Sequence, residues 1–220
     1  TRTAIDSPMK IDGADYTFID TAGLKKKEFR QAQPDIFSGF QSFKAIRRSD
    51  VCFFVIDATQ DITKQDQRVA SEIFNLEKGC IVLANKCDLL TKAETEKLGK
   101  ATGPNAKKRD DSYQTVRDYI SHHFSFLWSS PVFFVSAISG EGIEEALSAI
   151  KPIFESRNKV MEESALQEFL QTKLKVNQPK LLRDQKKPKV YALKQLDVNT
   201  PKFELIVNYP AAISTNFRKF

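Results

Sequence analysis

The stretch Cys80-Ile81-Val82-Leu83-Ala84-Asn85-Lys86-Cys87-Asp88 decides the fold: an apolar run of strand length ends at an Asn, and a carboxylate follows three residues later. A carboxylate held at the end of such a strand can accept hydrogen bonds from the N1–H and the 2-amino group of a guanine, and adenine offers no matching pair of donors. Each of these bonds contributes roughly 1.5 to 3 kcal/mol, and an acceptor left unpaired rejects the wrong base. The stretch therefore predicts a strand end that reads guanine.

Two further strings stand at the ends of apolar runs. Asp20-Thr21-Ala22-Gly23 follows the run at 16–19, and Ser136-Ala137 follows the run at 132–135. Ligands of open α/β sheets bind at the carboxyl ends of the strands. In this order, the three strings resemble the third, fourth and fifth sequence boxes of a GTP-binding domain. Taken singly, each carboxylate could also be an ordinary turn residue after a strand.

The phosphate-binding loop G-x-x-x-x-G-K-[ST] occurs nowhere in the sequence. A circularly permuted domain would carry that loop after the fifth box, but the last glycine of the chain is Gly142. Without it, no nest of backbone amides is available to hold the nucleotide phosphates. We therefore expect an N-terminally incomplete GTP-binding domain, and we expect this polypeptide alone to be inactive.

Apolar runs alternate with amphipathic stretches up to residue 155. The runs are 51–57, 80–85 and 131–136, and the predicted helices are 63–76, 113–126 and 143–154. This rhythm predicts an α/β domain whose mostly parallel sheet is covered on both faces. Thr63-Lys64-Gln65-Asp66 predicts a capping box for the first of these helices, and Gly79 predicts its stop.

The pattern changes in the last third of the chain, so we place a domain division between residues 155 and 156. A predicted helix at 160–174 precedes two alternating strands at 189–196 and 202–208, and the start of another helix follows at about 214. This order predicts a small α+β domain. The chain ends inside that last element, so we expect the small domain to be C-terminally incomplete.

The positive charge of the chain belongs to this second domain. Residues 157–220 hold 13 Lys and Arg against 6 Asp and Glu, whereas residues 1–156 hold 21 against 22. Such an excess indicates a polyanionic partner or a merely solubilising surface. Residues 143–220 contain no glycine, which disfavours single-strand clamping through the G-x-x-G loop of KH domains. Electrostatic contact with RNA and docking against a GTP-binding domain both stay open.

Composition points to the cytoplasm and away from membranes. The apolar stretches have the length of strands, and neither a signal peptide nor a membrane span is predicted. The chain has three cysteines, an odd number, and they lack C-x-x-C spacing. We therefore interpret Cys52, Cys80 and Cys87 as reduced thiols rather than as a disulfide framework or a zinc site.

Longer strings narrow the resemblance. Thr1-Arg2-Thr3-Ala4-Ile5-Asp6, Asp20-Thr21-Ala22-Gly23-Leu24-Lys25-Lys26-Lys27, Val55-Ile56-Asp57-Ala58 and Pro201-Lys202-Phe203-Glu204-Leu205-Ile206-Val207-Asn208-Tyr209-Pro210 are similar to the second G domain and C-terminal KH-like domain of the EngA (Der) family. The resemblance implies a Ras-like P-loop GTPase domain followed by a KH-like domain. It also implies a phosphate loop and another G domain upstream in the intact chain.

The family's implied role is hydrolysis of GTP to GDP and phosphate during assembly of the large (50S) ribosomal subunit, with that subunit and its rRNA as partners. Two features depart from the family pattern. Thr3 stands where the family usually has Asp, so a carboxylate is missing near the effector loop, and we expect the KH-like sheet to lack its final strand in this sequence.

The resemblance also implies roles for single residues. Thr1 and Asp20 would hold Mg²⁺, and the Gly23 amide would contact the γ-phosphate. Leu24 stands where Ras-like enzymes carry the glutamine that orients water, so no catalytic residue is assigned, and a potassium ion is the family's usual substitute for an arginine finger. The predicted nucleotide-binding residues are Asp20, Thr21, Ala22, Gly23, Leu24, Asn85, Lys86, Asp88, Ser136 and Ala137, and the predicted RNA or ribosome contacts include Lys186, Lys187 and Lys189.

An alternative from another class stays open: a non-hydrolysing module without a phosphate loop that binds RNA or protein. The presence of G-x-x-x-x-G-K-[ST] directly before Thr1 in the full-length gene product would decide between the two. An Era-type GTPase is disfavoured by the absent G-x-x-G, and a tRNA-modifying GTPase by the KH-like tail.

Overall fold

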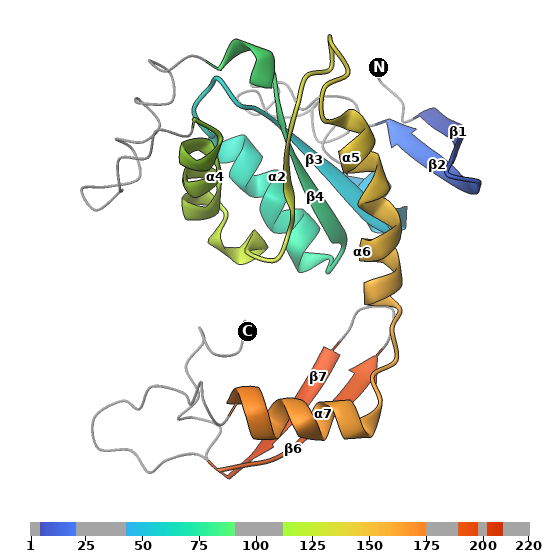
Figure 1. Cartoon of the computed structure of the whole chain (residues 1–220), viewed down its shortest axis with the longest axis vertical. Helices are drawn as coiled ribbons and strands as arrows, with labels where there is room; N and C mark the ends of the chain where they lie inside the picture. Colours follow the sequence, from blue (N-terminus) through green and yellow to red (C-terminus); the bar gives the residue numbers. More distant parts are fainter. Residues whose placement is uncertain (1–4, 21–42, 91–111, 175–188, 198–201, 209–220) are drawn as a thin grey trace, which may run out of the picture. The chain divides into compact units, whose positions relative to one another are not determined.

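The chain forms two compact units, Thr1–Phe154 and Glu155–Phe220. A computed structural model (Figure 1) describes residues 5–20, 43–90, 112–174, 189–197 and 202–208. Each unit is described by itself. No helix among these residues is long and apolar enough to cross a membrane.

The first unit is organised by a parallel sheet of β3 (Val51–Asp57), β4 (Gly79–Asn85) and β5 (Val132–Val135), in the order β3-β4-β5. The predicted runs 51–57 and 80–85 are thus strands, and the predicted parallel sheet is confirmed. Asp57 pairs with Asn85, and Asn85 pairs with Val135. The three strands therefore end level with one another at their carboxyl edge.

The sheet is accompanied by α2 (Lys64–Asn75), α4 (Ser112–His123), α5 (Ile143–Ser148) and α6 (Ile150–Arg157), and residues 43–48 are helical as well. Figure 1 shows α2 and α4 on one side of β3 and β4, with α5 and α6 on the other. On the α2 and α4 side, Phe54 meets Phe124 edge to face at 5.2 Å between ring centroids. Ala70 and Ile73 of α2 are buried in the same core.

The start of α2 confirms the predicted capping box. The Thr63 hydroxyl accepts a hydrogen bond from the Asp66 amide, and the Asp66 carboxylate accepts one from the Thr63 amide. The predicted stop is wrong: Gly79 is the first residue of β4. The helix ends earlier, because Glu77 adopts the left-handed conformation at φ 54°.

Two predicted helices are shorter than expected. The 113–126 segment ends as an α-helix at His123 and continues as a 3-10 turn over Ser125–Leu127. The 143–154 segment divides into α5 and α6 at Ala149. Pro152 lies in the first turn of α6, has no N–H to donate to the Ser148 carbonyl, and disfavours an uninterrupted helix through this point.

A β-hairpin precedes the sheet. β1 (Ile5–Ile11) and β2 (Ala14–Asp20) are antiparallel and turn at Asp12 and Gly13, whose φ values are 48° and 79°. Only residues 16–19 were predicted as a strand, although Asp-Gly is a strong hairpin signal. Among the described residues the hairpin forms a sheet of its own. Phe18 stacks on Phe53 of β3 at 6.2 Å, and Arg48 forms a two-bonded ion pair with Asp6.

The second unit has the predicted α-β-β order. It contains α7 (Glu163–Phe169), a π-helical turn over Leu170–Leu174, and the antiparallel strands β6 (Val190–Asp197) and β7 (Lys202–Val207). Gln195 of β6 accepts from the Met161 amide at 2.7 Å and donates to the Lys159 carbonyl at 3.0 Å, which fixes the segment before α7. The helix predicted at about 214 lies outside the described residues.

The glycines of the β5–α5 loop give a matched test of the packing at the carboxyl edge. Gly142 has φ 70°, and a Cβ there would meet the Phe134 carbonyl oxygen at 2.1 Å. Gly140 has φ 83° and no atom within 4 Å of such a Cβ. We expect Gly140→Ala to cost only the left-handed conformation, about 1 to 2 kcal/mol of unfolding free energy. Gly142→Ala should cost clearly more, because the backbone must also shift. Equal costs in urea unfolding would contradict this packing.

Candidate functional site

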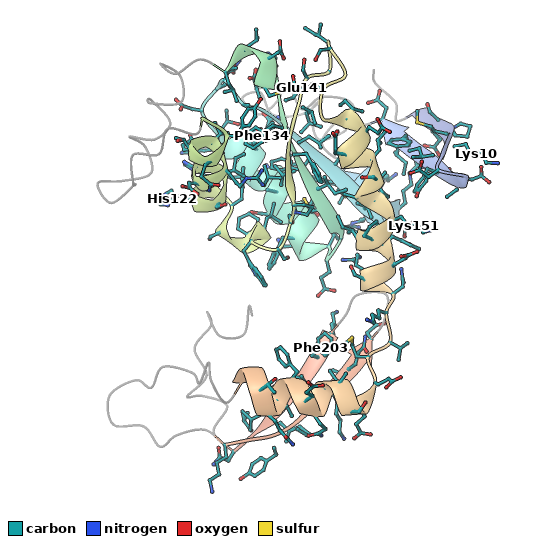
Figure 2. The ribbon with its side chains drawn as sticks, viewed as in Figure 1. Lys10, His122, Phe134, Glu141, Lys151 and Phe203 are labelled. Atoms are coloured by element: carbon teal, nitrogen blue, oxygen red, sulfur yellow. The ribbon has the colours of Figure 1, made fainter. Side chains whose placement is uncertain are left out.

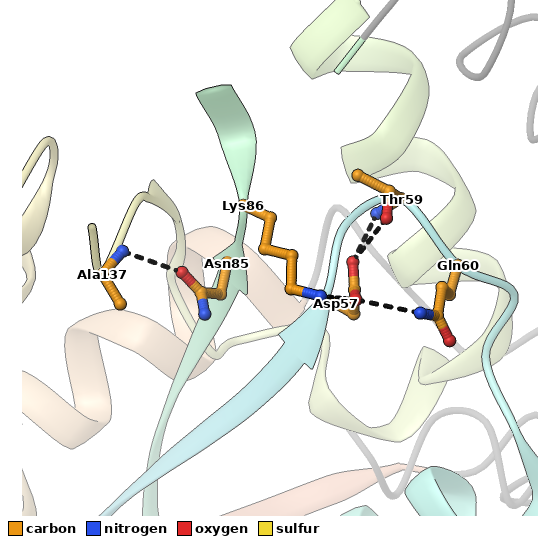
Figure 3. Close-up of polar contacts among 6 residues, drawn as sticks. All are labelled: Asp57, Thr59, Gln60, Asn85, Lys86 and Ala137. Carbon is orange, nitrogen blue, oxygen red and sulfur yellow. Dashed lines mark hydrogen bonds and ion pairs between the residues drawn. The ribbon is translucent and has the colours of Figure 1, made fainter. Parts of the chain in front are cut away.

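Polar residues gather where the three parallel strands end (Figure 3). Asp57 ends β3 and Asn85 ends β4, directly opposite each other in the ladder. Ser136 and Ala137 follow the end of β5. Because the strands are parallel and in register, these segments must meet at one edge of the sheet.

Asn85 joins this edge together. Its side-chain Oδ1 accepts a hydrogen bond from the Ala137 amide at 3.0 Å, and its carbonyl accepts one from the Ala58 amide at 2.8 Å. One residue of β4 therefore bonds to the segments that follow both neighbouring strands. The fourth and fifth predicted boxes are directly linked through it.

The side chains of the turn after Asn85 differ in their exposure to solvent. Lys86 adopts the left-handed conformation at φ 66° and is exposed, Cys87 is only 5% exposed, and Asp88 is exposed. Burial, together with the charge of Glu141, raises the pKa of the Cys87 thiol. A neutral apolar side chain thus anchors the turn, and the two charged side chains beside it face solvent.

Asp57 is the centre of a small polar cluster. Its Oδ1 accepts from the Thr59 amide at 3.0 Å and the Thr59 hydroxyl at 2.7 Å, and its Oδ2 accepts from Gln60 Nε2 at 3.1 Å. Lys86 Nζ lies 2.6 Å from the same Oδ2. Burial alone would raise the pKa of Asp57, but the hydrogen bonds from Lys86 and Thr59 outweigh it and the pKa is lowered.

The loop after β5 is closed by its own backbone. The Ser136 amide donates to the Glu141 carbonyl at 3.0 Å, and the Gly140 amide donates to the Ser136 carbonyl at 2.8 Å. Ser136 is 1% exposed, and its hydroxyl accepts from the Ser139 amide at 3.4 Å. Figure 2 shows Glu141 on this loop, beyond Phe134 of β5. The hydroxyl of Ser136 therefore holds the loop in shape.

The structure brings five of the predicted nucleotide-binding residues to one edge: Asn85, Lys86, Asp88, Ser136 and Ala137. Asp20 ends β2 of the hairpin and is exposed. Lys189 is exposed in the second unit, where its amide donates to Asn208 Oδ1 at 2.7 Å. Seven predicted residues lie outside the described residues: Thr1, Thr21, Ala22, Gly23, Leu24, Lys186 and Lys187.

Sequence reasoning assigned no role to Asp57. The available signal was its position, because it ends an apolar run as Asn85 does. Cys52, Cys80 and Cys87 form no disulfide and are buried, and burial raises the pKa of Cys80 to about 12. Within the described ranges, no three His, Cys, Asp or Glu residues are grouped so that they could hold a metal ion. Metal binding by Thr1 and Asp20 therefore stays a prediction.

Two family models match separate segments of the chain. Residues 1–86 match the family described as "50S ribosome-binding GTPase". Residues 161–220 match the family described as "KH-domain-like of EngA bacterial GTPase enzymes, C-terminal".

Curated relatives named GTPase Der align with the whole chain. The proteins of Thermosynechococcus vestitus, Nostoc punctiforme and Thermoanaerobacter sp. (strain X514) are 30%, 32% and 31% identical over 100% of it. The chain spans 46%, 45% and 46% of their respective lengths.

Among solved structures, a probable GTP-binding protein engB aligns at 17% identity and a TM-score of 0.47, over 70% of this chain and 83% of that one, a likeness too low to carry an inference. The assignment to a family rests instead on the two family matches and on the alignments that cover the whole of this chain. The chain belongs to the EngA family of bacterial GTPases, whose relatives above are named GTPase Der.

Proposed function

We propose that this chain supplies the guanine-reading edge of a GTP-hydrolysing switch, and that the switch acts in assembly of the large ribosomal subunit. One observation carries the proposal. The hydrogen bond from the Ala137 amide to Asn85 Oδ1 joins the strand ends of two predicted boxes, beside a turn that exposes Asp88. An edge built in this way offers a carboxylate from a rigid position, as recognition of a flat base requires.

Asp88 is the base-reading group in this proposal. Cys87 fixes the turn from inside, and the Leu89 amide closes it by donating to the Lys86 carbonyl at 3.0 Å. Among the described residues, no hydrogen bond or ion pair uses the Asp88 carboxylate. It can therefore accept from the N1–H and the 2-amino group of guanine without breaking an existing contact, and Ser136 and Ala137 would border the base.

The phosphate side of the proposal rests on residues at the end of β2 and beyond. Asp20 would hold Mg²⁺ through water, together with Thr1, and the Gly23 amide would meet the γ-phosphate, flanked by Thr21, Ala22 and Leu24. Magnesium would neutralise the charge on the phosphates during transfer to water. Leu24 can neither donate nor accept a hydrogen bond through its side chain, so charge stabilisation must come from elsewhere. A potassium ion would supply it.

The second unit is proposed to contact ribosomal RNA. Its support is the excess of 13 Lys and Arg over 6 Asp and Glu in residues 157–220, and the match to the KH-like domain of EngA. Lys189 is exposed and directly precedes β6. A second G domain in the same intact chain would complete the switch, in the cytoplasm.

Nucleotide choice tests the guanine-reading edge. Asp88→Asn replaces one acceptor by a donor, so GTP affinity should fall on the order of 100-fold, because two charge-assisted bonds are lost or weakened. The affinity for xanthosine triphosphate should rise, since its 2-oxo group can accept a hydrogen bond from the new side-chain amide.

Titration of both nucleotides against the full-length gene product measures this, with any other nucleotide site silenced. Asp50→Asn is the matched control, because Asp50 is exposed and directly precedes β3, at the opposite end of that strand from Asp57. Unchanged GTP affinity in Asp88→Asn would remove Asp88 from the site.

Charge reversal tests the second unit. Replacing Lys186, Lys187 and Lys189 together by Glu should weaken binding to large ribosomal subunits and flatten its salt dependence, because fewer phosphate counterions are released. Co-sedimentation over a range of salt concentrations measures both effects. The control reverses three exposed residues of the first unit, Lys10, Arg47 and Lys64, for the same change in net charge. If the folded variant sediments with subunits as wild type does at every salt concentration, the charge of the second unit is only solvated surface.

A further inference from the structure

We infer that Asp57 is a positioning residue of the nucleotide site: its carboxylate, held by Thr59 and Gln60, fixes the direction of the Lys86 side chain. The inference rests on the proposed function and adds Asp57 to its residues. It concerns the one ion pair that Lys86 makes among the described residues, with Nζ 2.6 Å from Asp57 Oδ2.

Residues other than Lys86 already hold the Asp57 carboxylate in place. Two donors of Thr59 converge on Oδ1, at 3.0 Å and 2.7 Å, and the Gln60 amide reaches Oδ2 at 3.1 Å. Figure 3 shows these donors on one side of Asp57 and the Lys86 side chain arriving from the other. A carboxylate with both oxygens engaged by its own turn cannot rotate freely. It therefore offers Lys86 a single place to bind.

The backbone keeps the two partners in register. Asp57 lies opposite Asn85 in the parallel ladder, and the Ala58 amide donates to the Asn85 carbonyl at 2.8 Å. The residue after Asp57 is thus tied to the residue before Lys86. At the other end of the side chain, the Lys86 backbone adopts φ 66°, and its carbonyl accepts a hydrogen bond from the Leu89 amide at 3.0 Å.

Stability does not explain such an arrangement. The Lys86 side chain is 46% exposed and that of Asp57 is 21% exposed, and ion pairs at the protein surface contribute little to folding because water screens them. An exposed lysine otherwise samples many rotamers, which any ligand contacting it must restrict at a cost in entropy. Pairing with Asp57 removes that cost in advance.

A fixed Lys86 side chain would contact the flat face of the bound base, whereas Asp88 would bind its edge. Lys86 and Asp88 flank the buried Cys87 on one turn, so a base whose edge is bound by Asp88 lies beside the Lys86 side chain. Its methylene groups form an apolar strip that a flat ring can contact. This contact does not depend on the substituents of the ring. Asp57 should therefore contribute to nucleotide affinity and not to the choice between guanine and xanthine.

A double-mutant cycle tests the inference in the full-length gene product, with any other nucleotide site silenced and GDP carrying a fluorescent ribose label as the probe. Asp57→Asn keeps the size of the side chain and an acceptor for Thr59 but removes the charge. We expect it to weaken binding about fivefold to tenfold, and to weaken it less than about twofold further in a Lys86→Ala background. Asp57→Glu, which keeps the charge, should recover most of the affinity.

Asp50→Asn controls for the loss of a carboxylate next to the same strand and should bind as wild type does. The ratio of labelled GDP to labelled xanthosine diphosphate affinity should stay unchanged in Asp57→Asn, whereas Asp88→Asn should change it. If Asp57→Asn unfolds, Thr59→Val provides a second route, because it removes one donor to Asp57 and leaves both charges. It should give a smaller loss of affinity that also disappears in the Lys86→Ala background.

The outcomes are distinguishable. If wild type does not bind GDP, the proposed function is overturned and this inference with it. If wild type binds and folded Asp57→Asn binds equally well, only the inference is overturned. It is also overturned if Asp57→Asn weakens binding by the same factor with and without Lys86, because Asp57 would then act through the turn at Thr59 rather than through the lysine.

Discussion

The parallel register of β3, β4 and β5 is the constraint on which the site depends. It places Asp57, Asn85 and Val135 side by side, so whatever follows each strand begins at the same level. Burial holds that register, because Phe54 and Ile56 of β3 are buried on one face while Val55 between them is 55% exposed, and a slip by one residue would exchange the two faces. The geometry of the polar edge is thus set by the apolar sheet, because the segment after each strand starts from a fixed position.

Two side-chain contacts connect the segments that follow the aligned strands. Asn85 bonds to the Ala137 amide and ties the loop after β5 to the central strand. Lys86 pairs with Asp57 and ties the turn after β4 to β3. Between them, Cys87 is buried and Asp88 is exposed, so the only carboxylate on this turn is presented outward while its neighbours are held. Preorganisation of this kind lowers the entropy that a ligand must remove on binding.

Sequence reasoning was strongest where burial and local capping decide the structure. The run 51–57 is β3 residue for residue, and Thr63 and Asp66 form the predicted capping box. Sequence reasoning was weakest where one or two residues override a pattern. Periodicity predicted one helix over 143–154, but the helix is interrupted close to Pro152. The hairpin that turns at Asp12-Gly13 was missed because its first strand, with Ser7, Pro8 and Lys10, does not alternate between apolar and polar residues. The pairing of Asp57 with Lys86 needs both the register and the left-handed turn. Periodicity supplies the first and gives no sign of the second.

The central claim, that this edge of the sheet reads guanine, is tested most directly by equilibrium binding of GDP, inosine diphosphate and ADP to the full-length gene product with any other nucleotide site silenced and this edge unaltered. Inosine lacks the 2-amino group, so its diphosphate forfeits one bond to Asp88 and should bind on the order of 10-fold more weakly than GDP. ADP, which lacks the N1–H as well, should show no measurable binding. Equal affinities for the three diphosphates would contradict the account, because the phosphates alone would then determine binding and Asp88 would read nothing.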